Sequence, residues 1–259
     1  MKPPAPRDPW SALSALTPAR IAPGRSGASL PTRAVLAFAL DHARARDAVH
    51  AVFDAAALAR QIEALGLTTI TVDSSAGDRA TYLRRPDLGR RLSDESAVAL
   101  PKGSLCDLAI IIGDGLSSAA VHAHAPPLLA ALIPHIAKAA WRTAPIILAS
   151  QARVALGDQV GERLGARMAV MLVGERPGLS SPDSLGAYLT YAPRVGRSDA
   201  ERNCISNIRP AGLSYEEAAF KIAWHVGEAL RLGLTGVGLK DDSGLARLTG
   251  SSSSGLFSP

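Results

Sequence analysis

Two polar blocks, each of which follows an apolar run, hold the residues best suited to bind a ligand. The first has the sequence GERPGL at positions 174–179, and the second has DAERNCISNI at positions 199–208. Proline and glycine turn the chain in the first block, so Glu175 and Arg176 lie beyond a predicted strand with free side chains. Open α/β sheets bind ligands at such strand ends. An ordinary turn with two solvated side chains is the alternative for this block.

A glycine-containing loop within IIIGDGLSS at 110–118 is a second place where a ligand could bind. It lies between a predicted buried strand and a helix start, so its backbone amides could face a phosphate or amide group. The third glycine of a dinucleotide-binding fingerprint is missing, which makes NAD a weak prediction. A structural turn and a ligand loop both stay open for these residues.

The cysteines and histidines predict no catalytic or metal centre. Cys204 has no histidine near it in sequence, so a buried or ligand-contacting thiol is favoured over a nucleophile. His122 and His124 are two positions apart and would point in different directions from a helix. No serine stands in a nucleophile elbow, and no pair of acids has a spacing that assigns acid and base roles. We therefore predict no catalytic residue and no metal ligand in this chain.

Composition excludes several classes of protein. The chain has 259 residues, of which 47% are hydrophobic and only 4% aromatic, with a formal charge of +5. So few aromatics argue against nucleic-acid binding by base stacking, and the arginine pairs at 84–85 and 90–91 are interpreted as a solvated or subunit-contacting loop. No apolar run reaches membrane-spanning length, and five prolines interrupt the first 20 residues. We expect no nucleic acid, no membrane and a location in the reducing cytosol.

The order of predicted elements indicates an α/β fold. Strands are expected at 68–72, 108–112, 146–149, 169–173 and 187–191, and helices at 33–46 after an N-cap at Thr32, 55–65, 116–140 with a break at Pro126-Pro127, 157–164 and 215–230. This alternation predicts a Rossmann-like, mostly parallel sheet flanked by helices, with a helical N-terminal region. The predicted divisions are an extended arm at 1–30, a mainly helical region at 31–100, a Rossmann-like core at 101–245 and a disordered tail at 246–259.

Taken together, the blocks resemble one enzyme family. Besides the three above, they include SSPDSL at 180–185, LTGVGLKD at 234–241, ARI at 19–21, GRSG at 24–27 and DHARARDAV at 41–49. In this order and spacing they are similar to the small (light) subunit of ethanolamine ammonia-lyase, over roughly residues 17–242. No single block would suffice, but chance does not produce so many in order.

The resemblance implies an enzyme subunit that is active only with a partner. In the family, a separate large subunit holds the substrate and the catalytic acids, and adenosylcobalamin starts the radical conversion of ethanolamine to acetaldehyde and ammonia. The small subunit covers the cofactor from its nucleotide side. The sequence lacks the Asp-x-His-x-x-Gly pattern of many cobalamin-binding domains, so the implied mode is base-on, with dimethylbenzimidazole still on cobalt. The protein would bind and shield a cofactor that itself performs the chemistry.

Carrying the family's cofactor contacts over by position places them at Val154, Glu175 and Cys204, all expected just beyond strands. The alternative to this assignment is a non-enzymatic, Rossmann-like module that binds a nucleotide or metabolite through its 113–118 loop. Family members are often enclosed in a bacterial microcompartment. The proline-rich residues 1–18 do not decide whether this chain is enclosed in one. The arginine-rich segment 17–47 is expected to clamp the large subunit.

Overall fold

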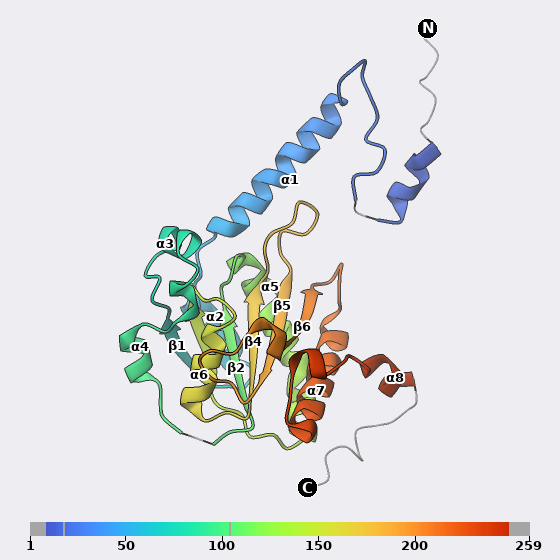
Figure 1. Ribbon diagram of the computed structural model, residues 1–259. Helices are drawn as coiled ribbons and strands as arrows, with labels where there is room; N and C mark the ends of the chain where they lie inside the picture. Colours follow the sequence, from blue (N-terminus) through green and yellow to red (C-terminus); the bar gives the residue numbers. More distant parts are fainter. Residues whose placement is uncertain (1–8, 18, 104, 249–259) are drawn as a thin grey trace.

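The strands form one six-stranded sheet in a computed structural model that describes residues 9–17, 19–103 and 105–248 (Figure 1). Their spatial order is β1 (Thr69–Asp73), β3 (Ile146–Ser150), β2 (Leu108–Gly113), β4 (Met168–Gly174), β5 (Leu185–Tyr191) and β6 (Arg202–Ile208). The first four are parallel, β5 runs antiparallel to β4, and β6 runs antiparallel to β5. The predicted α/β fold with a mostly parallel sheet is thereby confirmed. Every residue of β2 and β4 is buried, as their unbroken apolar sequences require.

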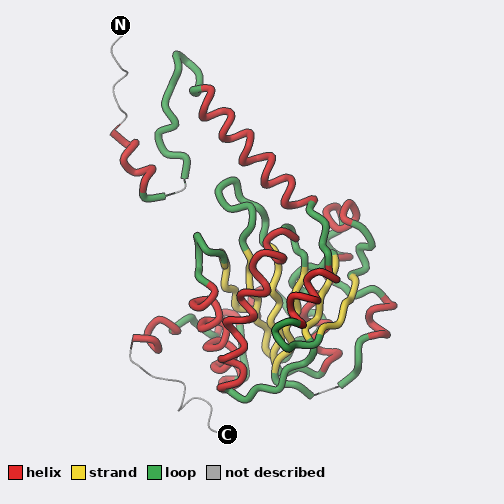
Figure 2. The backbone as a smooth tube through the Cα atoms, turned by 180° about the vertical axis from the view of Figure 1, so that it is seen from behind, coloured by secondary structure: helices red, strands yellow, loops and turns green. Residues whose placement is uncertain are grey.

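Helices cover both faces of this sheet (Figure 2). One face packs against α2 (Ala55–Glu63), α5 (Ser118–Lys138) and α7 (Tyr215–Leu232). The other face packs mainly against α6 (Leu156–Leu164), beside the short segments α3 (Arg79–Arg84), η2 (Leu88–Arg90) and α4 (Asp94–Ala99). Among the helices of the described residues, none has the length and hydropathy needed to cross a membrane. The predicted division into regions at residues 100 and 245 stays a prediction, although β1 joins the sheet through β3.

Three local predictions were wrong. Helix α5 continues through Pro126 and Pro127, because its buried leucines pack against the sheet and outweigh the lost backbone hydrogen bonds. Thr32 lies inside α1 (Thr32–His50), and Pro31 occupies the N-cap position. The 199–208 block, for which no strand was expected, forms η3 (Asp199–Glu201) and β6. Pairing with β5 satisfies the backbone groups that would otherwise leave the edge of the sheet open.

The N-terminal part stands away from the body of the molecule (Figure 1). It consists of η1 (Pro9–Ala15), a loop and α1, so the expected extended arm is helical over Pro9–Ala15. The loop folds back on α1, where Arg20 pairs with Asp41 at 2.6 Å and stacks on Phe38. At the other end, η4 (Gly236–Gly238) precedes α8 (Ser243–Leu248). The predicted tail lies outside the described residues, except for positions 246–248, which end α8.

Candidate functional site

A cavity of about 540 Å³ lies at the carboxyl ends of β2, β3 and β4. The chain leaves β2 toward one face of the sheet, where α5 packs, and leaves β3 toward the other face, where α6 packs. Ligands of open α/β folds bind in the crevice that forms between two such neighbouring strands. The loops after the three strands supply Gly115, residues 152–155 and Glu175. A further wall comes from Tyr82 and from Arg90, one of the arginines that the sequence assigned to a solvated or subunit-contacting loop.

Two of the three residues carried over from the family line this cavity, namely Val154 and Glu175. Cys204 does not line it. The expectation that Cys204 follows a strand was wrong, because it lies within β6, in register with Tyr188 of β5. Tyr188 does line the cavity, and its hydroxyl and the Cys204 thiol share a hydrogen bond. Cys204 therefore adjoins the cavity through Tyr188, on the sheet face that α6 covers.

The Glu175 carboxylate is held in place by its neighbours. Its Oε2 accepts a hydrogen bond of 3.1 Å from the Asn207 backbone N–H, and the Glu175 N–H donates to the Ser184 carbonyl. Gly186 makes room for it, because a Cβ there would lie 3.0 Å from Glu175 Oε1. No basic side chain of the described residues forms an ion pair with Glu175. The carboxylate is thus a fixed acceptor for an N–H donor in the cavity.

The Cys204 thiol lacks the features of a nucleophile. Its surface is partly open to solvent, but the surrounding protein raises the pKa of the thiol, and the nearby Glu175 charge raises it further. Burial also raises the pKa of the Tyr188 hydroxyl. The thiol is therefore neutral near pH 7, whereas nucleophilic cysteines need the thiolate. Among the described residues, no cluster of three His, Cys, Asp or Glu side chains could hold a metal ion.

The glycine loop after β2 acts mainly as a structural turn. Its backbone N–H groups at Asp114, Leu116 and Ser117 all donate to carbonyls within the protein, so they are not free to bind a phosphate. Gly115 touches the loop after β4 so closely that a Cβ would lie 2.2 Å from the Gly174 carbonyl oxygen. The glycines of the GDG and GERPG blocks thus allow the backbones of the loops after β2 and β4 to contact each other.

Asp114 ties the loop that carries Val154 to the rest of the cavity. Its side chain is 1% exposed, and its two oxygens accept hydrogen bonds from the Ala152 N–H at 2.9 Å and from Arg79 Nη1 at 3.2 Å. Arg79 also donates to the Val49 carbonyl at the end of α1. Burial raises the pKa of the Asp114 carboxyl to about 6, although the Ala152 N–H and the Arg79 charge oppose that rise.

This raised pKa predicts a pH-dependent contribution to stability. The folded chain keeps the Asp114 proton up to about pH 6, whereas the unfolded chain loses it near 3.8. The protonated Asp114 carboxyl therefore contributes its full stabilisation below about pH 3.8. This contribution is lost as the pH rises through about 6, which lowers the free energy of unfolding by at most about 3 kcal/mol. Urea unfolding measures this effect. The free energy of unfolding of Asp114→Asn, minus that of the wild type, should increase between about pH 4 and pH 7. A difference that is constant over this range would contradict the assignment.

Two arginines that sequence reasoning did not single out enclose a tyrosine at the cavity wall. The guanidinium groups of Arg79 and Arg153 lie 4.7 and 4.5 Å from the Tyr82 ring centroid. The Tyr82 hydroxyl donates to the Ala152 carbonyl, and Arg153 Nη2 donates to the Tyr82 carbonyl. One aromatic among arginines, in a chain with few aromatics, was the only sequence signal. The contacts of Tyr82 with Ala152 and Arg153 join positions about 70 residues apart.

Comparison with known proteins agrees with this architecture. The family model for "Ethanolamine ammonia-lyase light chain (EutC)" matches residues 7–240. The ethanolamine ammonia-lyase small subunit of Bradyrhizobium diazoefficiens is 61% identical over 244 residues, which cover 93% of this chain and 94% of that protein. The same subunits of Azotobacter vinelandii and Rhodopseudomonas palustris are 56% and 59% identical, and each match covers at least 92% of both chains. A free-standing metabolite-binding module is therefore not favoured. This chain belongs to the small-subunit family of ethanolamine ammonia-lyase, a carbon–nitrogen lyase.

Proposed function

We propose that this chain joins a large subunit and covers adenosylcobalamin from its nucleotide side, with dimethylbenzimidazole still on cobalt. The observation that carries the proposal is the convergence of Val154, Glu175 and the Tyr188–Cys204 pair around one cavity at the carboxyl edge of the sheet. The relatives are named as small subunits, which implies a larger partner. The substrate site and the catalytic acids are assigned to that partner.

The residues present suit such a cofactor. The rim of a corrin ring carries amide groups, which need both donors and acceptors. The backbone N–H groups of Val154 and Ala155 donate to no acceptor in the described part of the chain, so an apolar residue such as Val154 can still offer a polar contact. Glu175 supplies an acceptor beside them. No histidine lines the cavity within the described residues, which agrees with a cofactor that keeps its own base.

In this proposal the chain contributes binding and shielding. Bound adenosylcobalamin would supply the radical that begins the conversion of ethanolamine to acetaldehyde and ammonia. Glu175, fixed by Asn207 and Gly186, would orient the cofactor rim. Tyr82 and Tyr188 line the wall and would keep water away from the enclosed face. None of these residues needs to exchange a proton with the substrate.

Co-purification tests the proposal directly. The chain is co-expressed with a large subunit from one of its relatives, incubated with adenosylcobalamin and passed through a desalting column. We expect the absorption spectrum of base-on cobalamin to travel with the complex. A complex that forms but carries no cobalamin would reject the proposed function. The predicted cytoplasmic location, with or without a microcompartment, is a separate proposal that fractionation of a native host would test.

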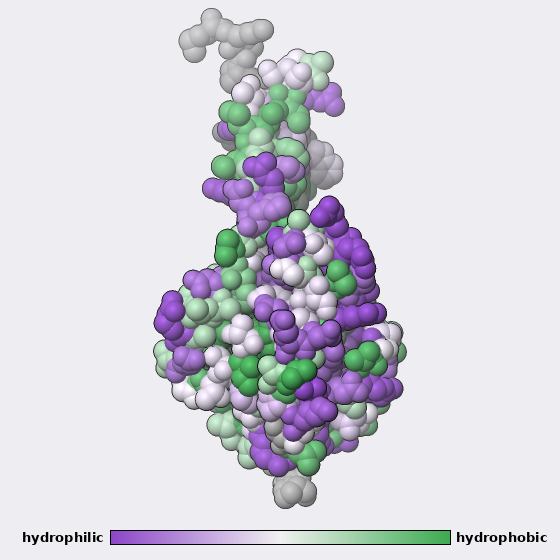
Figure 3. All heavy atoms as spheres, turned by 90° about the vertical axis from the view of Figure 1, so that its left-hand side faces the viewer, coloured by the Kyte–Doolittle hydropathy of each residue, from purple (hydrophilic) through white to green (hydrophobic). Residues whose placement is uncertain are grey.

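The projecting N-terminal part is the proposed docking element for the large subunit. Apolar side chains gather on it in Figure 3, although helices of isolated subunits normally bury such residues. They include Val35, Leu36, Phe38 and Leu40 of α1, whose only buried residue is Ala48. Arginines at 25, 33, 44 and 46 lie near them in the sequence, and arginine is favoured at interfaces. Arg20 pairs with Asp41 and stacks on Phe38 at close range, whereas Arg44 and Arg46 lie 4.0 Å from Asp41 and Asp47.

Deletion of residues 1–27 should therefore impair assembly and leave the core folded. The described residues of the deleted segment, 9–17 and 19–27, form no strand of the sheet and lie outside both core clusters. Circular dichroism and the melting temperature should stay close to those of the full chain, while the yield of complex in a pull-down with the large subunit falls. If the truncated chain assembles and supports activity as well as the full chain, the arm is not the docking element, and the interface must lie at the carboxyl edge of the sheet.

A pair of point variants gives a matched control for this docking element. Leu36→Glu places a charge on α1 at a side chain that is 64% exposed, and Val98→Glu does the same on α4 at one that is 79% exposed. Neither change should unfold the chain, because both side chains are largely in solvent. Only Leu36→Glu is expected to lower the pull-down yield.

A further inference from the structure

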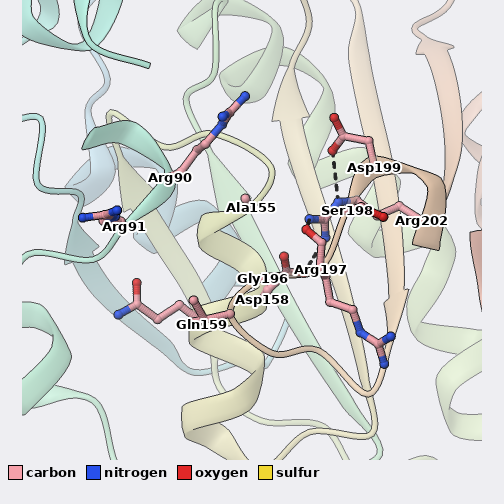
Figure 4. A pocket seen from close by; sticks show the side chains of 11 residues that line it. Arg90, Arg91, Ala155, Asp158, Gln159, Gly196, Arg197, Ser198, Asp199 and Arg202 are labelled. Atoms are coloured by element: carbon pink, nitrogen blue, oxygen red, sulfur yellow. Dashed lines mark hydrogen bonds and ion pairs between the residues drawn. The ribbon is translucent and has the colours of Figure 1, made fainter. Parts of the chain in front are cut away.

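A second cavity, of about 560 Å³, adjoins the first. The two share Arg90, Ala155 and Asp199 as lining residues, so together they form one groove across the N-terminal end of α6. Figure 4 shows Arg90 and Arg91 on one side of the second cavity, Ser198, Asp199 and Arg202 on the other, and Asp158 and Gln159 of α6 between them. We call the two cavities together the arginine groove.

Some arginines of the groove are already paired. Arg202 is buried and donates to Asp158 at 2.6 Å and to Asp199 at 3.3 Å. Arg197 pairs with Glu201. Both acidic residues that line the second cavity, Asp158 and Asp199, therefore have Arg202 as a partner, and these contacts explain the two arginines as structural.

Other arginines of the groove have no such explanation. In the described part of the chain, no acidic side chain lies within ion-pair distance of four of them, namely Arg90, Arg91, Arg153 and Arg176. Glu175 is the one lining carboxylate without a basic partner. The groove therefore keeps an excess of positive charge, which suits a ligand with an anionic group.

Arg90 and Arg153 are held next to each other. The Arg153 backbone N–H donates to the carbonyl of Gly89, the residue before Arg90, at 2.8 Å. Stacking on Tyr82 and the bond from Nη2 to the Tyr82 carbonyl fix the Arg153 guanidinium, while Nη1 has no protein partner and is not enclosed. The free N–H groups of Val154 and Ala155 lie beside them, at the positive end of the α6 dipole.

We propose that Arg90 and Arg153, with these two backbone N–H groups, bind the phosphodiester in the nucleotide tail of the cofactor. The inference rests on the proposed function, because it extends the same site from the corrin rim to the tail. Arg90 can present two parallel N–H donors that match two phosphate oxygens, and Arg153 can add Nη1; bonds between guanidinium and phosphate are among the strongest in proteins. The phosphodiester is the anionic group at the periphery of cobalamin.

The test measures cofactor binding and does not depend on turnover. Arg90→Gln is the test variant, because Arg90 is exposed and no other residue depends on its side chain. Arg84→Gln is the matched control, since Arg84 is an exposed arginine of α3 that lines neither cavity. Each complex with the large subunit is titrated by equilibrium dialysis in the dark with adenosylcobalamin and with adenosylcobinamide, which lacks the nucleotide tail.

Arg90→Gln should raise the Kd for adenosylcobalamin by about 10- to 100-fold and leave that for adenosylcobinamide within about twofold. Arg84→Gln should change neither. Rising KCl should weaken adenosylcobalamin binding to the wild type and to Arg84→Gln, but much less to Arg90→Gln. If adenosylcobinamide binds too weakly to measure, the difference in salt dependence between the variants is sufficient to test the phosphate assignment.

Equal losses for both cofactors, or an unchanged Kd for adenosylcobalamin with unchanged salt dependence, would overturn the phosphate assignment. These results differ from a failure of the proposed function, in which the wild-type complex would bind no adenosylcobalamin at all. Arg153→Lys adds an independent check, because it keeps the charge but loses the guanidinium fork. It should weaken adenosylcobalamin binding and spare adenosylcobinamide.

Discussion

Cys204→Trp is expected to lower the affinity of the complex for cobalamin by about 100-fold or more while the chain still folds. Cys204 is exposed on β6 and hydrogen-bonds to Tyr188, which lines the cavity. An indole ring at this position would project in front of the sheet face that the cofactor is proposed to cover. The fold should tolerate it, because Cys204 is exposed and belongs to neither core cluster. Spectral titration gives the affinity, and thermal melting gives the stability.

Cys204→Ser is the matched control for this variant. Serine keeps the size of the thiol and can hydrogen-bond to Tyr188, so affinity should stay within a few-fold of the wild type. If tryptophan and serine behave alike, the face around Cys204 does not contact the cofactor. If tryptophan instead unfolds the chain, the melting curve will reveal it.

Glu175→Ala is expected to weaken cobalamin binding by about one to two decades. A hydrogen bond to a charged acceptor contributes roughly 1.5 to 3 kcal/mol, and each 1.4 kcal/mol changes the affinity about tenfold. Stability should change less, because Glu175 accepts only one backbone hydrogen bond in the described structure, from Asn207.

Glu175→Gln separates charge from shape at the same position. It keeps one acceptor oxygen and the length of the side chain, so we expect an intermediate affinity. A Kd equal to the wild-type value in Glu175→Ala would show that the carboxylate does not reach the cofactor.

The parts of the fold that the sequence predicted are those in which local pattern and burial agree. The unbroken apolar runs of β2 and β4 are buried on both faces, as expected of central parallel strands. Ser214 caps α7 and its side chain accepts from the Glu217 N–H, in a local pattern of serine before two glutamates that is typical of a helix start. The carboxyl edge was also the correct place to look for a cavity, and Val154 and Glu175 both line it.

The parts that it did not predict depend on contacts between distant segments. Strand β6 carries Asn203 and Asn207, which have low β-propensity, and its pairing with β5 makes it a strand. The wall that includes Tyr82 is fixed by bonds to residues 152 and 153, which no local pattern could reveal. The arginine groove likewise appears only when η2, α6 and η3 meet in three dimensions.

Turnover of ethanolamine by the reconstituted complex shows whether this chain is an essential subunit of the enzyme. This chain, a large subunit of the same family and adenosylcobalamin are mixed, and acetaldehyde and ammonia are measured with each component omitted in turn. We expect product only when all three are present, because this chain carries no constellation of catalytic residues among those described. Deamination of ethanolamine by this chain and adenosylcobalamin alone, or an undiminished rate when this chain is left out, would contradict it.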